Sequence, residues 1–463
     1  MSKTYSLWRL YRQHYRSLIH LGIPIIMGQL AMVVLSFFDT LMVGQYGTRD
    51  LAAASFTVSL VFLPLVFLQG IAMGVVPFSG AAFGKKDTAL AGFYLKNSIS
   101  VAIINTFLCI LLMIVLYFFL PYMGQDPSLL PLINPLYIIY LFSMPFAMIF
   151  NIGKQFTDSI TQTRISMYVI TGGVLFNIIF NYLLIYGIGP FPELGVIGAG
   201  IATLIARILM GGSYLFIIIY NKDIKIYFHA AIKAKWNKKC HVEIQKMGWP
   251  IATQLVLEGS GFVLTTIIAG WISTTTMAAH QIMLSLSQVF FLIFAGIGMA
   301  ITVRVSNFNG QKKYKSVRNT VQAGYQMILA IVLINIIIIF SLRGFIGKMF
   351  TSDQEILKIL PPAMIFLAVY QIADASQMTF ISALRGIGRV KIVALTSFVS
   401  YILISLPISY FMGITFNYGL AGIWTAFPIS LSIAAIIYYR SYINYLSPKI
   451  FFKKISSMKK SIC

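Results

Sequence analysis

Residues 52–83 read AAASFTVSLVFLPLVFLQGIAMGVVPFSGAAF, and no charged side chain interrupts them. A membrane-spanning helix needs roughly 20 consecutive, mostly apolar residues, so this stretch is long enough to cross a bilayer. Because the bilayer core offers no hydrogen-bond partners to the backbone, a spanning stretch of this kind must be helical. Stretches of similar character recur along the whole chain.

The composition agrees with a membrane protein. Of the 463 residues, 58% are hydrophobic and only 10% are charged, whereas soluble domains carry about 25% charged residues. We therefore predict an all-α integral membrane protein with twelve transmembrane helices. The expected spans are 18–43, 52–83, 95–120, 131–153, 165–188, 196–220, 245–271, 277–303, 319–342, 359–383, 391–413 and 418–439.

The basic residues predict the orientation of these spans. Of the 35 Lys and Arg residues, only Arg49, Arg343, Lys348 and Lys358 fall in loops on one side of the membrane. Arg207 lies inside the sixth span, and the others lie at the termini or near the opposite loops. Since basic loops stay in the cytoplasm, both termini are expected there, in a bacterial inner membrane. This topology explains the net charge of +23, and we expect no nucleic-acid partner.

The chain contains an internal duplication. The region from Gly22 aligns without gaps with the region from Gly248, at an offset of 226 residues, and further along Gly195 and Gly198 match Gly419 and Gly422 at an offset of 224. Each half holds six spans, so both enter the membrane in the same sense, as in a parallel repeat. Rocking of two such lobes gives alternating access to a central cleft. The expected parts are a cytoplasmic N-terminus 1–17, an N-lobe 18–220, a basic linker 221–244, a C-lobe 245–446 and a basic tail 447–463.

Three carboxylates, Asp39, Glu258 and Asp374, lie within apolar spans. An ionised acid at such a position costs roughly 2.5–3.5 kcal/mol to insert, so these residues usually serve an ion, a proton or a cationic substrate. The duplication does not repeat them, because Asp39 corresponds to Thr265 and Glu258 to Met32. The alternative is that they are neutral, hydrogen-bonded packing residues.

The first acid belongs to a set of polar residues in the N-lobe. With a helical rise of about 1.5 Å per residue, Asp39, Asn177, Asn181 and Thr203 all fall in the outer leaflet. Asn177 and Asn181 are four residues apart and share one helix face. Carboxylate, amide and hydroxyl oxygens suit a hard cation, so we expect these four residues to bind Na⁺ or to exchange a proton.

A second set lies near the membrane midplane in the C-lobe. It comprises Glu258, Tyr370 and Asp374, and Tyr370 is one helical turn from Asp374. A phenol and two acids can share Na⁺ or hold a proton. Burial disfavours an unpaired charged carboxylate, whereas a bound cation favours it, so proton, sodium and a cationic drug compete. Such competition is the thermodynamic basis of antiport.

For two further residues, the sequence leaves two possible roles open. His280 is either a packing residue or a protonation site, and Arg207 either pairs with a buried acid or extends to the interface. The sequence has no Walker motif, no metal-ligand spacing and no nucleophile–base signature. We therefore expect no enzyme activity and no cofactor, with an ion gradient as the energy source.

Six segments together carry a resemblance to a known family. They are FFDTLMVG (37–44), QGIAMGVVPFSGAAFG (69–84), FNIIFNYLLIYG (176–187), ELGVIGAGIAT (193–203), MAAHQI (277–282) and YQIADASQMTFISALRG (370–386). In these segments the chain resembles the multidrug and toxic compound extrusion (MATE) family, in its NorM-like branch. The resemblance implies a two-lobe antiporter of organic cations, with the acid sets of both lobes as its binding sites.

The expected function is multidrug efflux driven by Na⁺ or H⁺. Its partners would be small-molecule drugs, toxic organic cations and membrane lipid, and we expect a monomer. One rival is a lipid-linked saccharide flippase, which would favour a cationic cavity, so the acids argue against it. A passive ion channel is a second rival, which the duplicated halves and lone acids disfavour.

Overall fold

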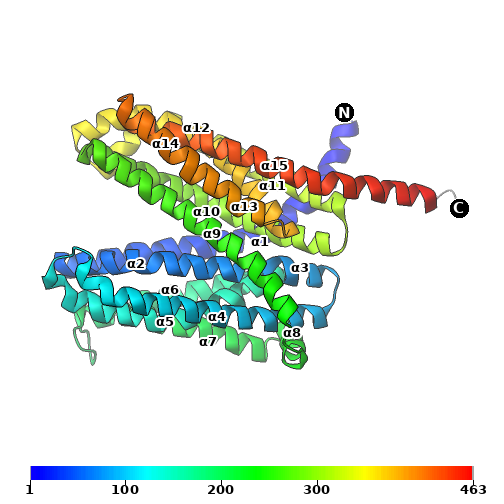
Figure 1. Cartoon of the computed structure of the whole chain (residues 1–463), viewed down its shortest axis with the longest axis horizontal. Coiled ribbons are helices and arrows are strands. Elements are labelled where there is room, and N and C mark those ends of the chain that lie inside the picture. Colours follow the sequence, from blue (N-terminus) through cyan, green and yellow to red (C-terminus); the bar gives the residue numbers. More distant parts are fainter. Residues whose placement is uncertain (1, 461–463) are drawn as a thin grey trace. The chain divides into compact units, whose positions relative to one another are not determined.

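The computed structural model describes residues 2–460, with side chains over 11–447. Within that range, twelve helical segments are long and apolar enough to cross a membrane, which confirms the predicted number of spans (Figure 1). The chain is helical throughout, with no strand in the part described. By contacts it divides into two compact units, residues 1–26 with 253–463 and residues 27–252.

The first half of the duplication and the linker together supply eight helices. They are α1 (Ser2–Tyr46), α2 (Thr48–Met73), α3 (Val76–Gly84), α4 (Thr88–Phe119), α5 (Leu130–Ser159), α6 (Thr163–Tyr186), α7 (Gly195–Tyr220) and α8 (Lys222–Lys233). The second half supplies α9 (Lys238–Ile272), α10 (Thr274–Gly310), α11 (Tyr314–Phe350), α12 (Gln354–Ile387), α13 (Lys391–Ser397), α14 (Leu406–Tyr410) and α15 (Gly419–Lys460).

The two units do not begin where the expected lobes begin. We expected lobes at 18–220 and 245–446, but the division by contacts runs through α1, after Ile26, and through α9, after Ala252. Both helices are continuous across the division, and each has a proline close to it, Pro24 and Pro250. A proline removes one backbone hydrogen bond and kinks a helix, so each helix can change direction there.

Two expected spans are irregular. The second, expected as one helix over 52–83, is interrupted between α2 and α3. There a Cβ on Gly74 would lie 2.9 Å from the backbone of Gly248, and Pro77 lacks an N–H. The eleventh alternates α13 and α14 with π-helical segments at Phe398–Ser405 and Phe411–Thr415. Pro407, next to the first π-helical segment, explains part of this irregularity.

Backbone features that recur at corresponding positions agree with the internal duplication. Lys86 and Lys312, which correspond in the duplication, adopt φ values of 60° and 57°. Such positive values are rare for residues other than glycine. Gly198 and Gly422 also correspond. A Cβ at either position would lie 2.4 Å from a carbonyl oxygen of the preceding span. Both halves therefore bring their last two spans into close contact through the same glycine.

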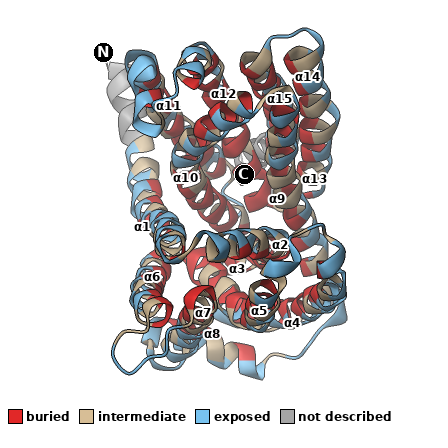
Figure 2. Ribbon diagram, turned by 90° about the vertical axis from the view of Figure 1, so that its left-hand side faces the viewer, coloured by how far each residue is buried: buried red, intermediate tan, exposed pale blue. Residues whose placement is uncertain are grey.

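Burial differs strongly among the helices of the second unit. In the most apolar 18-residue stretch of each helix, 61%, 50% and 56% of the residues are buried in α10, α12 and α15, compared with 22% in α11. In the ribbon of Figure 2, the buried residues of these helices are coloured red. Helix α12, which packs on α10, α11 and α15, thus forms the centre of this unit. It also carries two of the predicted site residues.

Part of the expected linker 221–244 is folded. Helix α8 buries Ile224, Tyr227 and Ala231 on one face, and it packs on α4. The Lys96 ammonium of α4 donates hydrogen bonds to the carbonyls of Ile232 and Ala234, at 3.2 and 2.7 Å. A cation at the carbonyl end of a helix is favourable, so Lys96 helps to fix α8 in place.

Candidate functional site

The four polar residues predicted in the N-lobe lie together. Asp39 comes from α1, Asn177 and Asn181 from α6, and Thr203 from α7. The amide of Asn181 donates to the Asp39 carboxylate and, at 2.9 Å, to the oxygen of Asn177. Asn177 in turn donates to the Thr203 hydroxyl at 3.4 Å. The four side chains therefore form one hydrogen-bonded chain across three helices.

One atom in this chain is left without a partner. Asn181 is fully buried, yet no residue in the described part of the structure donates to its Oδ1 atom. A buried acceptor that lacks a hydrogen bond costs about 1–3 kcal/mol. The unpartnered oxygen lies on the residue that contacts the Asp39 carboxylate, and together they form a donor set suited to a hard cation.

Arg207 and Tyr140 complete the surroundings of Asp39. The Arg207 guanidinium donates to the Ser143 hydroxyl at 2.5 Å, lies 5.4 Å from the centre of the Tyr140 ring and interacts electrostatically with Asp39. Tyr140 also interacts electrostatically with Asp39. Arg207 forms no ion pair with Asp39 in the described part of the chain, so its pairing with the buried acid stays a prediction.

The three residues predicted in the C-lobe also lie together. Glu258 comes from α9, and Tyr370 and Asp374 come from α12; their exposed fractions are 8%, 2% and 2%. Tyr370 and Asp374 interact electrostatically, and Asp374 also interacts electrostatically with Glu258 as a like charge. The Ser287 hydroxyl also contacts that of Tyr370, at 3.3 Å. Two acids that repel each other in a buried place are suited to share one proton or one cation.

Further polar residues surround Glu258 that the sequence analysis did not predict as members of the site. The Gln254 amide donates to Glu258 at 2.6 Å, and the Arg385 guanidinium donates to the Gln254 oxygen. Tyr401 interacts electrostatically with Glu258 and accepts a hydrogen bond from Gln377 at 3.1 Å. Helical spacing could have indicated two of them. Gln254 is one turn before Glu258, and Arg385 is about three turns after Asp374 on the same face.

His280 is fully buried and accepts a hydrogen bond from the Trp424 indole at 3.0 Å. Its other ring nitrogen has no partner among the described residues. The contact with Trp424 fits the packing alternative, and protonation of His280 stays a prediction.

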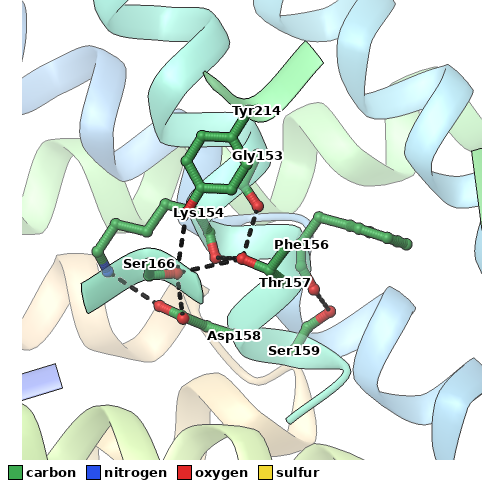
Figure 3. Close-up of polar contacts among 8 residues, drawn as sticks. All are labelled: Gly153, Lys154, Phe156, Thr157, Asp158, Ser159, Ser166 and Tyr214. Atoms are coloured by element: carbon green, nitrogen blue, oxygen red, sulfur yellow. Dashed lines mark hydrogen bonds and ion pairs between the residues drawn. The ribbon is translucent and has the colours of Figure 1, made fainter. Parts of the chain in front are cut away.

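A fourth buried acid, Asp158, lies at the end of α5, beyond the predicted limit of its span. Its carboxylate forms an ion pair with Lys154 at 3.0 Å and accepts a hydrogen bond from Ser166 at 2.7 Å (Figure 3). Tyr214 donates to Ser166 at 3.0 Å. Over the residues that the structure describes, this is the one ion pair. Asp158 is therefore satisfied by its own neighbours, in contrast to the acids of the two candidate sites.

The chain resembles proteins of known family over nearly its whole length. The family model MatE matches residues 24–183 and 250–411. A probable multidrug resistance protein NorM from Photorhabdus laumondii is 28% identical, over 94% of this chain and 95% of that protein. The multidrug resistance protein NorM of Photobacterium profundum is 27% identical, over 92% and 94%. Among solved structures, a MATE protein in a straight conformation superimposes with a TM-score of 0.85 at 18% identity, covering 94% and 97%.

Proposed function

The chain belongs to the MatE family, and from that premise we propose that it is a secondary active multidrug efflux antiporter. It exports amphipathic organic cations in exchange for Na⁺ or H⁺, and it lies in a bacterial inner membrane with both termini in the cytoplasm. The relatives named as multidrug resistance proteins support the efflux of drugs. The strong bias of Lys and Arg toward one set of loops supports the orientation.

The observation that carries the proposal is the unpartnered Asn181 oxygen beside Asp39. Asp39 and Asn181 supply a charged and a neutral oxygen, and Thr203 and Asn177 supply further oxygens within the same hydrogen-bonded chain. This donor set suits Na⁺, and a proton on Asp39 would neutralise the same charge. The residues present therefore fit either coupling ion.

The C-lobe set supports the same chemistry. Asp374 and Glu258 repel each other when both are charged, and a single proton or cation relieves that repulsion. An organic cation and the coupling ion would then compete for the same negative charge. Exclusion of one ligand by the other links their movements in opposite directions, which is the requirement for exchange.

Transport by purified protein in vesicles tests the proposal. Ethidium efflux is measured under a sodium gradient alone and then under a proton gradient alone, for the wild type and for Asp39→Asn, Glu258→Gln and Asp374→Asn. We expect gradient-driven efflux from the wild type and none from the three variants. Asp126→Asn is the matched control, because Asp126 is an exposed acid that caps a short turn at Ser128. Full activity in all three site variants would overturn the proposal.

A lipid-linked saccharide flippase remains the second candidate, and one observation favours it. Arg207 and Arg385 both lie within membrane spans, where an anionic substrate would need a cation. Each arginine, however, acts on an acid of its own lobe, Arg207 on Asp39 and Arg385 on Glu258. Cells that lack the protein distinguish the two: sensitivity to dyes supports the antiporter, and loss of envelope polymers supports the flippase.

A further inference from the structure

A crevice of about 700 Å³ runs along the unit formed by residues 1–26 and 253–463. Helix α12 forms its floor, and α11 and α15 form its walls, because both pack on α12 but touch each other little. Its lining exposes large apolar side chains, with Val369, Ile372 and Ile436 between 46% and 53% exposed. In a membrane span such surface faces lipid, so this lining is suited to an acyl chain.

One end of this crevice is polar and positively charged. Arg318, in the first turns of α11, is exposed, and over residues 11–447 it has no hydrogen bond or ion pair in the structure. The Tyr325 hydroxyl contacts that of Ser376 at 3.0 Å. Tyr442 is only 3% exposed, yet its hydroxyl has no partner in the described part of the chain, and Arg318 interacts with it electrostatically. An unpartnered buried hydroxyl beside a free guanidinium indicates a missing polar ligand.

The duplication provides an internal comparison. A crevice of about 470 Å³ lies at the corresponding place in the other unit, among α4, α5 and α7. Its lining is almost entirely apolar. The corresponding pairs are Ile99 and Tyr325, Leu215 and Tyr439, and Ile218 and Tyr442. Gly92 stands where the second half has Arg318, and a Cβ there would lie 2.6 Å from a side chain of α8. The fold therefore does not require the polar end, and only one of the two crevices has it.

We propose that the crevice between α11 and α15 binds an anionic phospholipid of the cytoplasmic leaflet. The phosphate contacts Arg318 and the hydroxyl of Tyr442, and an acyl chain lies along Val369, Ile372 and Ile436. A guanidinium is well suited to phosphate, which it binds through two parallel hydrogen bonds. The bias of basic loops predicts that the Arg318 end lies at the cytoplasmic surface, where anionic lipids are found.

The charge of the lining excludes the transported drugs as the preferred occupant. Arg318 is its one charged residue, with no Asp or Glu, so an organic cation would be repelled. The proposed lipid would also contact Ala373, next to Asp374 on α12. The proposal does not depend on the transport function, because it concerns lipid binding alone.

Native mass spectrometry of the full chain, purified in detergent with phosphatidylglycerol or phosphatidylcholine, tests the proposal. We expect the wild type to retain phosphatidylglycerol over phosphatidylcholine. Arg318→Gln should weaken retention of phosphatidylglycerol roughly tenfold, the effect of losing one charged hydrogen bond. Lys315→Gln is the matched control, since Lys315 is exposed in the same part of α11 but does not line the crevice. Ser432→Trp places a large side chain on the wall and should reduce retention of both lipids.

Thermal unfolding in the same detergent verifies that each variant is folded. Equal retention of the two lipids, or wild-type retention by folded Arg318→Gln or Ser432→Trp, would contradict the proposal. Displacement of phosphatidylglycerol by inorganic phosphate at the same concentration would identify a site for free anions and overturn it. Displacement by ethidium, with tighter ethidium binding by Arg318→Gln, would identify a drug site and overturn it as well.

Discussion

Asn181 donates a hydrogen bond to the carboxylate of Asp39 while its own buried oxygen has no hydrogen-bond partner in the described residues. Asn181 thus orients the acid and presents an acceptor that a cation can satisfy. Asp158 is the opposite case, because its carboxylate has both an ion pair and a hydroxyl donor. The two acids therefore differ in whether nearby side chains supply all the hydrogen-bond and ion-pair partners. Asp158, which has them, stabilises the fold, whereas the site of Asp39, the acid proposed to bind ions, keeps an unpartnered oxygen.

Asn181→Leu should raise the ion concentration that gives half-maximal efflux by roughly tenfold. The substitution keeps the branched shape and the number of side-chain heavy atoms, but it removes both the donor to Asp39 and the free oxygen, each worth on the order of one charged hydrogen bond. Efflux of ethidium by vesicles at graded Na⁺ or H⁺ measures the effect. Asn151→Leu serves as the control, because the Asn151 amide bonds only to a carbonyl of its own helix. Unchanged ion dependence in Asn181→Leu would mean that its oxygen is not a ligand.

Arg385→Lys should alter the response to the coupling ion and also reduce stability. Lysine keeps the charge but loses the planar donor that reaches the Gln254 oxygen, and a buried acceptor left unpaired costs about 1–3 kcal/mol. Unfolding in a denaturing detergent measures the free energy, and ion-dependent efflux measures the function. Arg389→Lys is the control, since Arg389 lies over the Tyr445 ring outside the site. A loss of stability without any change in ion dependence would assign Arg385 a purely structural role.

Gly198→Ala and Gly422→Ala should each destabilise the protein by about 1–3 kcal/mol, because the new methyl group would lie 2.4 Å from a backbone oxygen. Backbone atoms cannot move away as a flexible side chain can. Gly212→Ala is the matched control in α7, where no atom lies within 4 Å of the position that the new methyl group would occupy. It should be neutral or stabilising by up to about 1 kcal/mol, since alanine favours a helix. Thermal unfolding compares the three variants, and equal transitions would rule out the close contact.

Lys154→Met should destabilise the protein by about 3–5 kcal/mol, because it leaves the fully buried Asp158 without its cation. Replacing Asp158 by Asn in the same chain should restore part of the loss, since no unpaired charge then remains. Lys225→Met, at an exposed lysine of α8, is the control. Unfolding in denaturing detergent gives the three free energies. A double variant as unstable as Lys154→Met alone would show that the charge of Asp158 is not the cause.

The number of spans, and which polar residues of each lobe lie together, follow from the sequence because each depends on a local pattern. Apolar runs of membrane length predict helices, and helical periodicity predicts which residues share a face. The internal duplication adds which residues of the first half correspond to which residues of the second. The helical rise per residue is therefore enough to place Asp39 and Asn181 at a similar depth in the membrane.

The remaining partners depend on which helices become neighbours, and a single sequence does not specify this. For Arg207 the sequence leaves two alternatives open, and it does not indicate the contact with Ser143 of α5. Asp158 was missed because its span was expected to end at 153, whereas α5 continues to Ser159. The contacts divide the chain within α1 and α9, where no change of composition marks the point, and the expected lobe boundaries stay a prediction.

The contact division within α1 has a consequence for biosynthesis. Residues 1–26 leave the ribosome first, but they pack with residues that begin at Thr253. At about 5–20 residues per second, translation would keep that segment waiting on the order of 10–45 s for its neighbours. Cutting the chain in the loop between the halves would therefore not give two fragments that each fold alone. The first fragment would contain residues 1–26, whose packing partners lie in the second fragment.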